Sequence, residues 1–150
     1  MSTEANKATV RRWVEGGWNG GNLNLIDEMY TPDFMIHDPS APNFQGGTEA
    51  FKGFIGGFRT ALPDIHFTIE DMIATGDIVV WRWTARATSL GPLMGIPPTG
   101  KRATVTGIVI SRFDENGKWA EDYINWDTLG LLQQIGVVPT PGDEPVRAGR

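Results

Sequence analysis

Apolar residues in the first part of the chain recur at helical spacing. The repeat is clearest near the start, where it falls on Val10, Trp13, Val14 and Trp18. The glycine-rich run GGWNGG then breaks the repeat. The run LNLIDEMY predicts a second short helix that ends before Pro32, because the residue before a proline disfavours helical geometry. A short strand and a turn are expected next, in the run DFMIHDPSAP.

A third helix is predicted between Thr48 and Pro63. Thr48 is a suitable N-cap, because its hydroxyl can accept a hydrogen bond from a free backbone N–H of the first turn. The apolar face of this helix would consist of Phe51, Phe54, Ile55, Phe58 and Leu62. Pro63 is expected to end it.

From Ile65 onward the spacing changes to the two-residue alternation of β-strands. The predicted strands are IHFTIEDMIA, IVVWRWTARATSL, RATVTGIVISRF and KWAEDYINW. Asn116-Gly117 between the last two is a strong hairpin signal, and a terminal helix is expected from about Thr128. Helices followed by antiparallel strands predict an α+β fold, with helices packed on one face of a curved sheet.

The register of the last hairpin decides which side chains share a face. With Asn116 and Gly117 as a two-residue turn, Ser111 lies opposite Asp122. One face then carries Val109, Ser111, Asp122, Ile124 and Trp126. The other face carries Ile108, Ile110, Arg112, Glu121, Tyr123 and Asn125. A slip of one residue would exchange the two sets.

The run EDYINWDTLGLLQQIG places three carboxylates in an apolar segment, where a buried, unpaired carboxylate would be costly. Asp122 has no basic neighbour in this register, so it is the leading acid–base candidate; a solvated strand residue is the alternative. For Glu121, an ion pair with Arg112 is as good an interpretation as catalysis. Asp127 is also a catalytic candidate, but an N-cap role for the last helix is favoured.

The two histidines complete the survey of titratable groups. His37 is retained as a catalytic candidate, although an Asx-turn at Asp38 would leave it at the surface. Two distant histidines and no cysteine make a poor set of metal ligands, so no metal is expected. The chain also lacks a dinucleotide fingerprint, a phosphate-binding loop and a GxSxG motif, and no cofactor is expected.

Composition narrows the class of protein. The 150 residues suit one domain over 1–150, with an ordered core over about 6–139 and a flexible tail over 140–150. A net charge of −5 with scattered basic residues argues against nucleic-acid binding. There is no apolar leader and no apolar run long enough to span a membrane, which favours a cytoplasmic protein.

Several runs together resemble the SnoaL-like polyketide cyclase (ester cyclase) family, over residues 6 to 139. The resemblance is carried by NKATVRRWVEGGWNGGNLNLIDEMYTPDFMIHDP, LPDIHFTIEDMIATGDIVVWRWTARATSLG, LMGIPPTGKRATVTGIVISRF and WDTLGLLQQIG. It implies a cone-shaped fold like that of nuclear transport factor 2, with helices on a strongly curved, mostly antiparallel sheet around an apolar pocket. It also implies a homodimer formed through the outer face of the sheet.

The resemblance further implies a reaction, an intramolecular aldol ring closure without metal or cofactor. The family's acid–base carboxylate on the last strand maps to Asp122, with Glu121 as the fallback. Its assisting histidine on the preceding strand falls near Val109, so the sequence departs from the family pattern there.

Three functions are carried forward. The first is a cyclase-type lyase or isomerase acting on a hydrophobic carbonyl compound; the second is a hydrolase or double-bond isomerase on the same fold; the third is a non-catalytic binder of small apolar ligands. The candidate pocket residues are Trp13, Trp18, Phe51, Phe54, Trp83, Leu93, Met94, Val109, Tyr123, Ile124 and Trp126. Leu93, Met94 and Ile96 are expected to form a lid over the pocket.

Overall fold

The computed structural model describes residues 2–142, and most of the tail expected over 140–150 lies outside this range. The helices are α1 (Thr3–Trp13), the π-helix η1 (Val14–Asn19), α2 (Leu25–Met29), α3 (Thr48–Ala61) and α4 (Thr128–Gln134). The strands are β1 (Tyr30–His37), β2 (His66–Thr75), β3 (Ile78–Thr88), β4 (Arg102–Phe113) and β5 (Trp119–Trp126).

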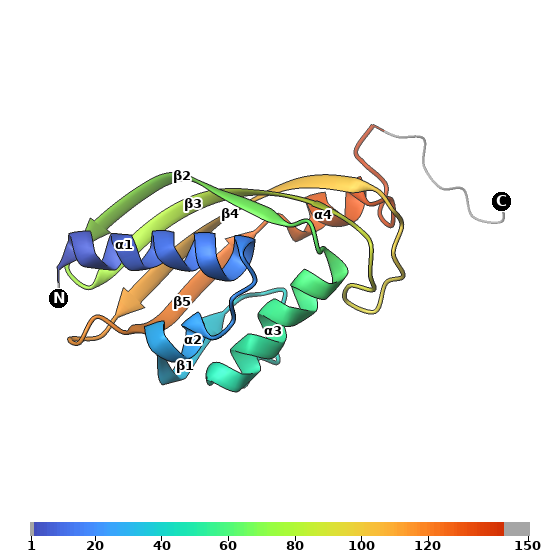
Figure 1. Ribbon diagram of the computed structural model, residues 1–150. Helices are drawn as coiled ribbons and strands as arrows, with labels where there is room; N and C mark the ends of the chain where they lie inside the picture. Colours follow the sequence, from blue (N-terminus) through green and yellow to red (C-terminus); the bar gives the residue numbers. More distant parts are fainter. Residues whose placement is uncertain (1, 143–150) are drawn as a thin grey trace.

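The strands form one curved, open sheet with the order β1-β5-β4-β3-β2 (Figure 1). β1 is parallel to β5, and the other three neighbouring pairs are antiparallel. Along β4, buried and exposed residues alternate without exception, so this strand has one core-facing side and one outer side. Figure 1 shows α1 and α3 on the same, inner side of the sheet. The α+β prediction is confirmed.

The glycine-rich run after α1 does not end the helix as predicted. The chain continues as the wider π-helix η1, a form that occurs frequently at functional sites. Asn19 closes it and fixes it to β2: its side chain accepts a hydrogen bond from the Phe67 N–H (2.7 Å) and donates one to the Phe67 carbonyl (3.0 Å). The Trp18 ring is thereby held with its centre 4.5 Å from the centre of the Phe67 ring.

The start of α3 also differs from the prediction. Thr48 is the first helical residue, and Gly47 occupies the N-cap position without a side-chain hydrogen bond. Gly47 has a φ of 94°, a conformation that residues with a Cβ rarely adopt. The glycine therefore makes the turn into the helix, and the Thr48 hydroxyl is not needed as a cap.

The β4–β5 hairpin has the predicted register and a different turn. Ser111 pairs with Asp122 as expected, but the loop contains three residues, with Gly117 at a φ of 77°. Asp114 holds the loop by accepting hydrogen bonds from the Asn116 and Lys118 N–H groups, at 2.9 Å each. A β-bulge next to Arg112 adds one residue to β5, which cancels the shift caused by the longer loop.

Candidate active site

A cavity lies between the helices and the inner face of the sheet. Its walls come from α1, η1, α3, α4 and strands β2 to β5, and they are almost entirely aromatic or aliphatic. The candidate wall residues that line it are Trp13, Trp18, Phe51, Phe54, Trp83, Val109, Ile124 and Trp126. An apolar cavity with few polar groups is typical of a site for a small hydrophobic ligand.

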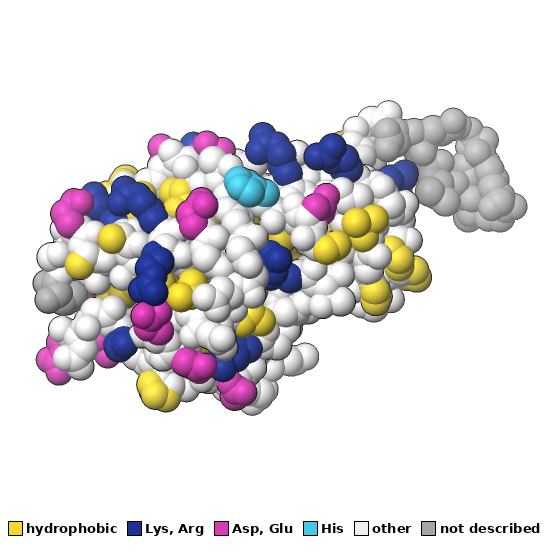
Figure 2. Space-filling model, in the orientation of Figure 1, with side chains coloured by type: hydrophobic (Ala, Val, Ile, Leu, Met, Phe, Trp, Pro, Cys, Tyr) yellow, Lys and Arg dark blue, Asp and Glu magenta, His cyan; other side chains and the backbone are white. Residues whose placement is uncertain are grey.

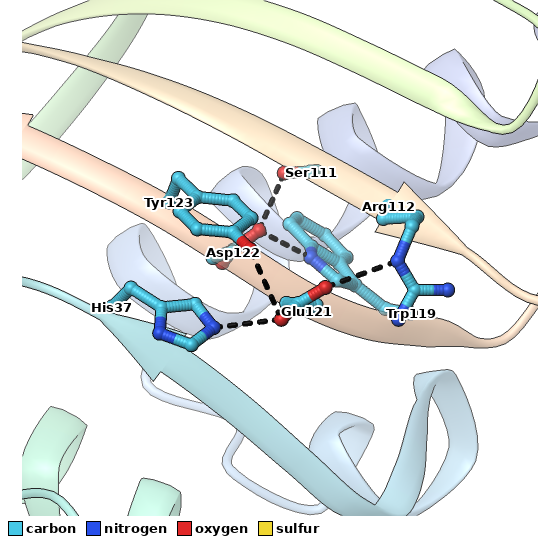
Figure 3. A network of polar contacts seen from close by, with 7 residues as sticks. All are labelled: His37, Ser111, Arg112, Trp119, Glu121, Asp122 and Tyr123. Carbon is cyan, nitrogen blue, oxygen red and sulfur yellow. Dashed lines mark hydrogen bonds and ion pairs between the residues drawn. The ribbon is translucent and has the colours of Figure 1, made fainter.

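Asp122 is one of two carboxylates that line this cavity. It is 4% exposed, and its Oδ1 accepts hydrogen bonds of 2.6 Å from Ser111 Oγ and 2.6 Å from Trp119 Nε1. Ser111 Oγ in turn accepts one from Trp81 Nε1 at 3.0 Å. Figure 3 shows these donors converging on the carboxylate from the neighbouring strand and from the same strand. Among the hydrogen bonds of the described residues none reaches Oδ2, which leaves that oxygen free to act on a ligand.

The environment of Asp122 raises its pKa to about 7. Burial is the main cause, because the charged form loses its hydration among apolar groups, and the nearby charge of Glu121 adds to it. The hydrogen bonds from Ser111 and Trp119 lower the pKa and partly oppose burial. The result is a carboxyl group that can both take up and release a proton near neutral pH.

Glu121 points to the opposite side of the sheet, so its catalytic candidacy is not supported. Its carboxylate binds Arg112 Nε at 3.0 Å and His37 Nε2 at 2.7 Å (Figure 3). The hydrogen bond from His37, followed by the interaction with Arg112, holds the pKa of Glu121 below its ordinary value. Strand alternation explains the difference from Asp122, because consecutive side chains face opposite sides.

Two further predicted site residues belong to this outer cluster. His37 stacks on Tyr123 with ring centres 4.4 Å apart, and Tyr123 is 49% exposed. Neither residue lines the cavity, so the structure does not support the predictions of His37 as a catalytic group and of Tyr123 as a pocket wall.

Asp127 and the β3–β4 loop also lie outside the cavity lining. Asp127 is the N-cap of α4, accepting a hydrogen bond from the Gly130 N–H at 2.8 Å, as the favoured interpretation stated. Leu93 is buried in the core, and Met94 is 46% exposed at a φ of 53°. The structure does not support the lid prediction, since neither these two residues nor Ile96 lines the cavity.

The second carboxylate of the cavity is Asp38, which sequence reasoning treated only as a turn residue. It does form the expected Asx-turn, in which Oδ1 accepts hydrogen bonds from the Ser40 N–H (2.8 Å) and Ser40 Oγ (2.7 Å). Its Oδ2 accepts one from Trp126 Nε1 at 3.2 Å, and the side chain lines the cavity at 6% exposure. The two-residue alternation in DFMIHDP, with Phe34 and Ile36 facing inward, was the signal that could have revealed it.

Within residues 2–142, no group of three or more His, Asp or Glu side chains is arranged to hold a metal ion. No described helix is both long and apolar enough to cross a membrane. On the face shown in Figure 2, acidic and basic side chains are interspersed, and apolar side chains gather at the end where Figure 1 draws the β3–β4 loop.

Comparison with known proteins agrees with this architecture. The model of the SnoaL-like polyketide cyclase family matches residues 8–135, and the chain belongs to this family. No curated protein matches the chain significantly in sequence.

Among solved structures, TsrD from Streptomyces laurentii is similar at 25% identity and a TM-score of 0.83, covering 92% of this chain and 99% of TsrD. IdmH from Streptomyces antibioticus, a candidate polyketide cyclase, is 30% identical with a TM-score of 0.76, covering 88% of this chain and 99% of IdmH. AclR from Streptomyces galilaeus, a candidate hydroxylase, is 27% identical with a TM-score of 0.80, covering 93% of this chain and 89% of AclR. The fold is therefore the nuclear-transport-factor-2-like fold of these proteins.

Proposed function

We propose that the protein is a cofactor-independent enzyme that acts on a hydrophobic carbonyl compound, with Asp122 as its general base. The observation that supports this most strongly is a buried carboxylate with a pKa of about 7 and a free oxygen in an apolar cavity. A base of this strength suits removal of a proton from carbon next to a carbonyl group. Family membership favours ring closure as the overall reaction.

The proposed chemistry needs no co-reactant. Asp122 takes a proton from the carbon beside a carbonyl, and the enolate carbon attacks a second carbonyl of the same molecule to form a carbon–carbon bond. The new alkoxide then takes the proton back from Asp122. Substrate and product have the same atoms, so the reaction is an intramolecular aldol addition.

The cavity favours this reaction over simple ligand storage. A site that only stores apolar ligands gains nothing from a buried carboxylate, because burying a charge destabilises the fold. This cavity contains two carboxylates, Asp38 and Asp122. A hydrolase or a double-bond isomerase would use the same base, and such activities remain the alternative. Val109 lines the cavity where the resemblance expects a histidine, so Asp122 would act without an imidazole partner.

A probe ketone can test proton abstraction without knowledge of the natural substrate. We expect the wild-type protein to accelerate hydrogen–deuterium exchange beside the carbonyl of 2-tetralone, a flat two-ring ketone, as followed by proton NMR. Asp122→Asn should lose most of this acceleration, since a general base contributes about a hundred- to ten-thousand-fold.

Binding of 2-tetralone provides the control for that experiment. Quenching of the cavity tryptophans should show that Asp122→Asn still binds the ketone, because asparagine preserves the shape of the side chain. Glu121→Gln should exchange at close to the wild-type rate, because Glu121 faces away from the cavity and its charge is the smallest of the contributions to the pKa of Asp122. Full exchange by Asp122→Asn would contradict the proposal.

A further inference from the structure

Asp38 has acceptor capacity that the protein itself does not fill. A carboxylate offers about four lone-pair sites. Two hydrogen bonds from Ser40 reach Oδ1, whereas Oδ2 receives only the indole N–H of Trp126. That N–H is shared, because it also lies 3.0 Å from Ser40 Oγ. Among the contacts of the described residues, no Lys, Arg or His side chain pairs with Asp38.

The parallel pairing of β1 with β5 places Asp38 close to Asp122. Ile36 is the partner of Asp122, and Asp38 follows two residues later on the same, inward side. Both side chains line the same cavity. A flat molecule of two fused rings can therefore contact both carboxylates at once.

The rest of the cavity lining offers a ligand few hydrogen-bonding partners. Apart from the two carboxylates and tryptophan indoles, every lining residue is apolar. A carboxylate that is 6% exposed and retains a free acceptor site is best satisfied by a hydrogen-bond donor of the ligand.

We propose that Asp38 is a specificity-determining residue that accepts a hydrogen bond from a hydroxyl group of the ligand and so fixes which part of the molecule meets Asp122. This inference rests on the proposed function for the identity of the reacting end. It narrows the substrate class to carbonyl compounds that carry a hydroxyl group at the far side of a flat ring system. The Asx-turn and Trp126 hold the carboxylate in place for this contact.

Two ketones with the same ring system, one with and one without a hydrogen-bond donor, test the proposed contact with Asp38. We expect the wild-type protein to bind 6-hydroxy-2-tetralone roughly tenfold or more tightly than 6-methoxy-2-tetralone, since a hydrogen bond to a charged group contributes about 1.5 kcal/mol or more. Both dissociation constants can be measured by quenching of tryptophan fluorescence. Equal affinity for the two probes would overturn the proposal, and this comparison requires no variant.

Variants then assign the preference to one residue. Asp38→Asn keeps an acceptor for the Asx-turn but removes the charge, and it should reduce the hydroxyl preference to about threefold or less. Asp71→Asn is the matched control, because Asp71 is paired with Arg82 on the surface and should leave the wild-type preference unchanged. If folded Asp38→Asn still prefers the hydroxy ketone over the methoxy ketone as strongly as the wild-type protein does, Asp38 is not the residue that accepts the hydrogen bond.

The two proposals fail in different ways. Asp122→Asn should keep the hydroxyl preference and lose deuterium exchange. Exchange without any hydroxyl preference would refute the role of Asp38 and leave Asp122 as the base. A hydroxyl preference in a wild-type protein that does not accelerate exchange would refute the enzyme proposal and leave Asp38 as a determinant of binding.

Discussion

Asp122 links the chemistry of the cavity to the stability of the fold. Because burial raises its pKa from 3.8 to about 7, the folded protein holds a proton that the unfolded chain has already released at intermediate pH. Between these two values, stability therefore falls as the pH rises. Below pH 3.8 Asp122 is protonated in both the folded and the unfolded state, and above about pH 7 the free energy of unfolding falls no further on its account.

Asp122→Asn removes this dependence, because asparagine does not titrate. We expect the variant to gain stability relative to the wild-type protein as the pH is raised from 4 to 8, by up to the order of 4 kcal/mol. Urea unfolding at the two pH values measures the difference. A difference that does not change with pH would show that Asp122 is not buried as described.

Glu121 shows the opposite behaviour one residue earlier in the chain. Its lowered pKa means that its contribution to stability is present above its unfolded-state pKa and is lost as the pH falls through the folded value. Glu121→Gln should cost about 1 kcal/mol or less at pH 7, because the ion pair with Arg112 is partly exposed. Chemical denaturation at pH 7 tests this, and a loss of several kcal/mol would mean a more deeply buried pair.

The outcome at these two residues shows what sequence patterns can specify about a site. Strand alternation and the hairpin register correctly separated Asp122 from Glu121, because both depend on local backbone geometry. For Asp38, alternation in DFMIHDP could have indicated an inward-facing side chain, but its position beside Asp122 depends on the parallel pairing of β1 with β5, which joins segments more than eighty residues apart. Local patterns do not encode such pairings.

At the scale of elements, the first turn of α4 is stabilised by the side chain of its N-cap residue, Asp127. Asp127 satisfies the Gly130 N–H, and a Cβ at Gly130 would lie 2.0 Å from Asp127 Oδ2. Asp127→Ala should therefore lower the free energy of unfolding by about 1 kcal/mol, whereas Asp127→Asn should be nearly neutral because asparagine caps equally well. Thermal unfolding compares the three proteins. Equal losses in both variants would indicate a role other than capping.

The elements themselves were predicted better than the ends and connections between them. The strand expected over RATVTGIVISRF agrees with β4 at both ends, because its alternation is unbroken. The π-helix η1 was predicted as a break, because glycine content alone does not distinguish a helix end from a widened turn. The lid prediction lacks support for a related reason, because apolar residues in a loop do not reveal whether they contact a cavity.

At the scale of the molecule, the outer face of the sheet carries exposed apolar side chains. Ile108 is 50% exposed, Ile110 is 41% exposed, and Ile110 is paired with the exposed Tyr123. The sequence resemblance implies a homodimer through this face, and we propose that a second copy of the chain covers it. Light scattering should give a dimer mass for the wild-type protein at micromolar concentration.

Ile110→Glu tests which surface forms this dimer. A charge placed among apolar residues at an interface is costly, so the variant should be monomeric while remaining folded. Met94→Glu is the control, because Met94 is exposed on the β3–β4 loop and belongs to no strand of the sheet, and it should remain dimeric. A wild-type monomer, or a dimer of Ile110→Glu, would contradict the proposed interface.

The central claim is that Asp122 is the cavity base, and the pH dependence of deuterium exchange into 2-tetralone tests it most directly. A base acts in its ionised form, so the wild-type exchange rate should rise with pH and level off above about 7, where Asp122 has lost its proton. Asp122→Asn should show a low rate without this inflection. A wild-type profile that is flat from pH 5 to 8, or an inflection near 7 that persists in Asp122→Asn, would contradict the account.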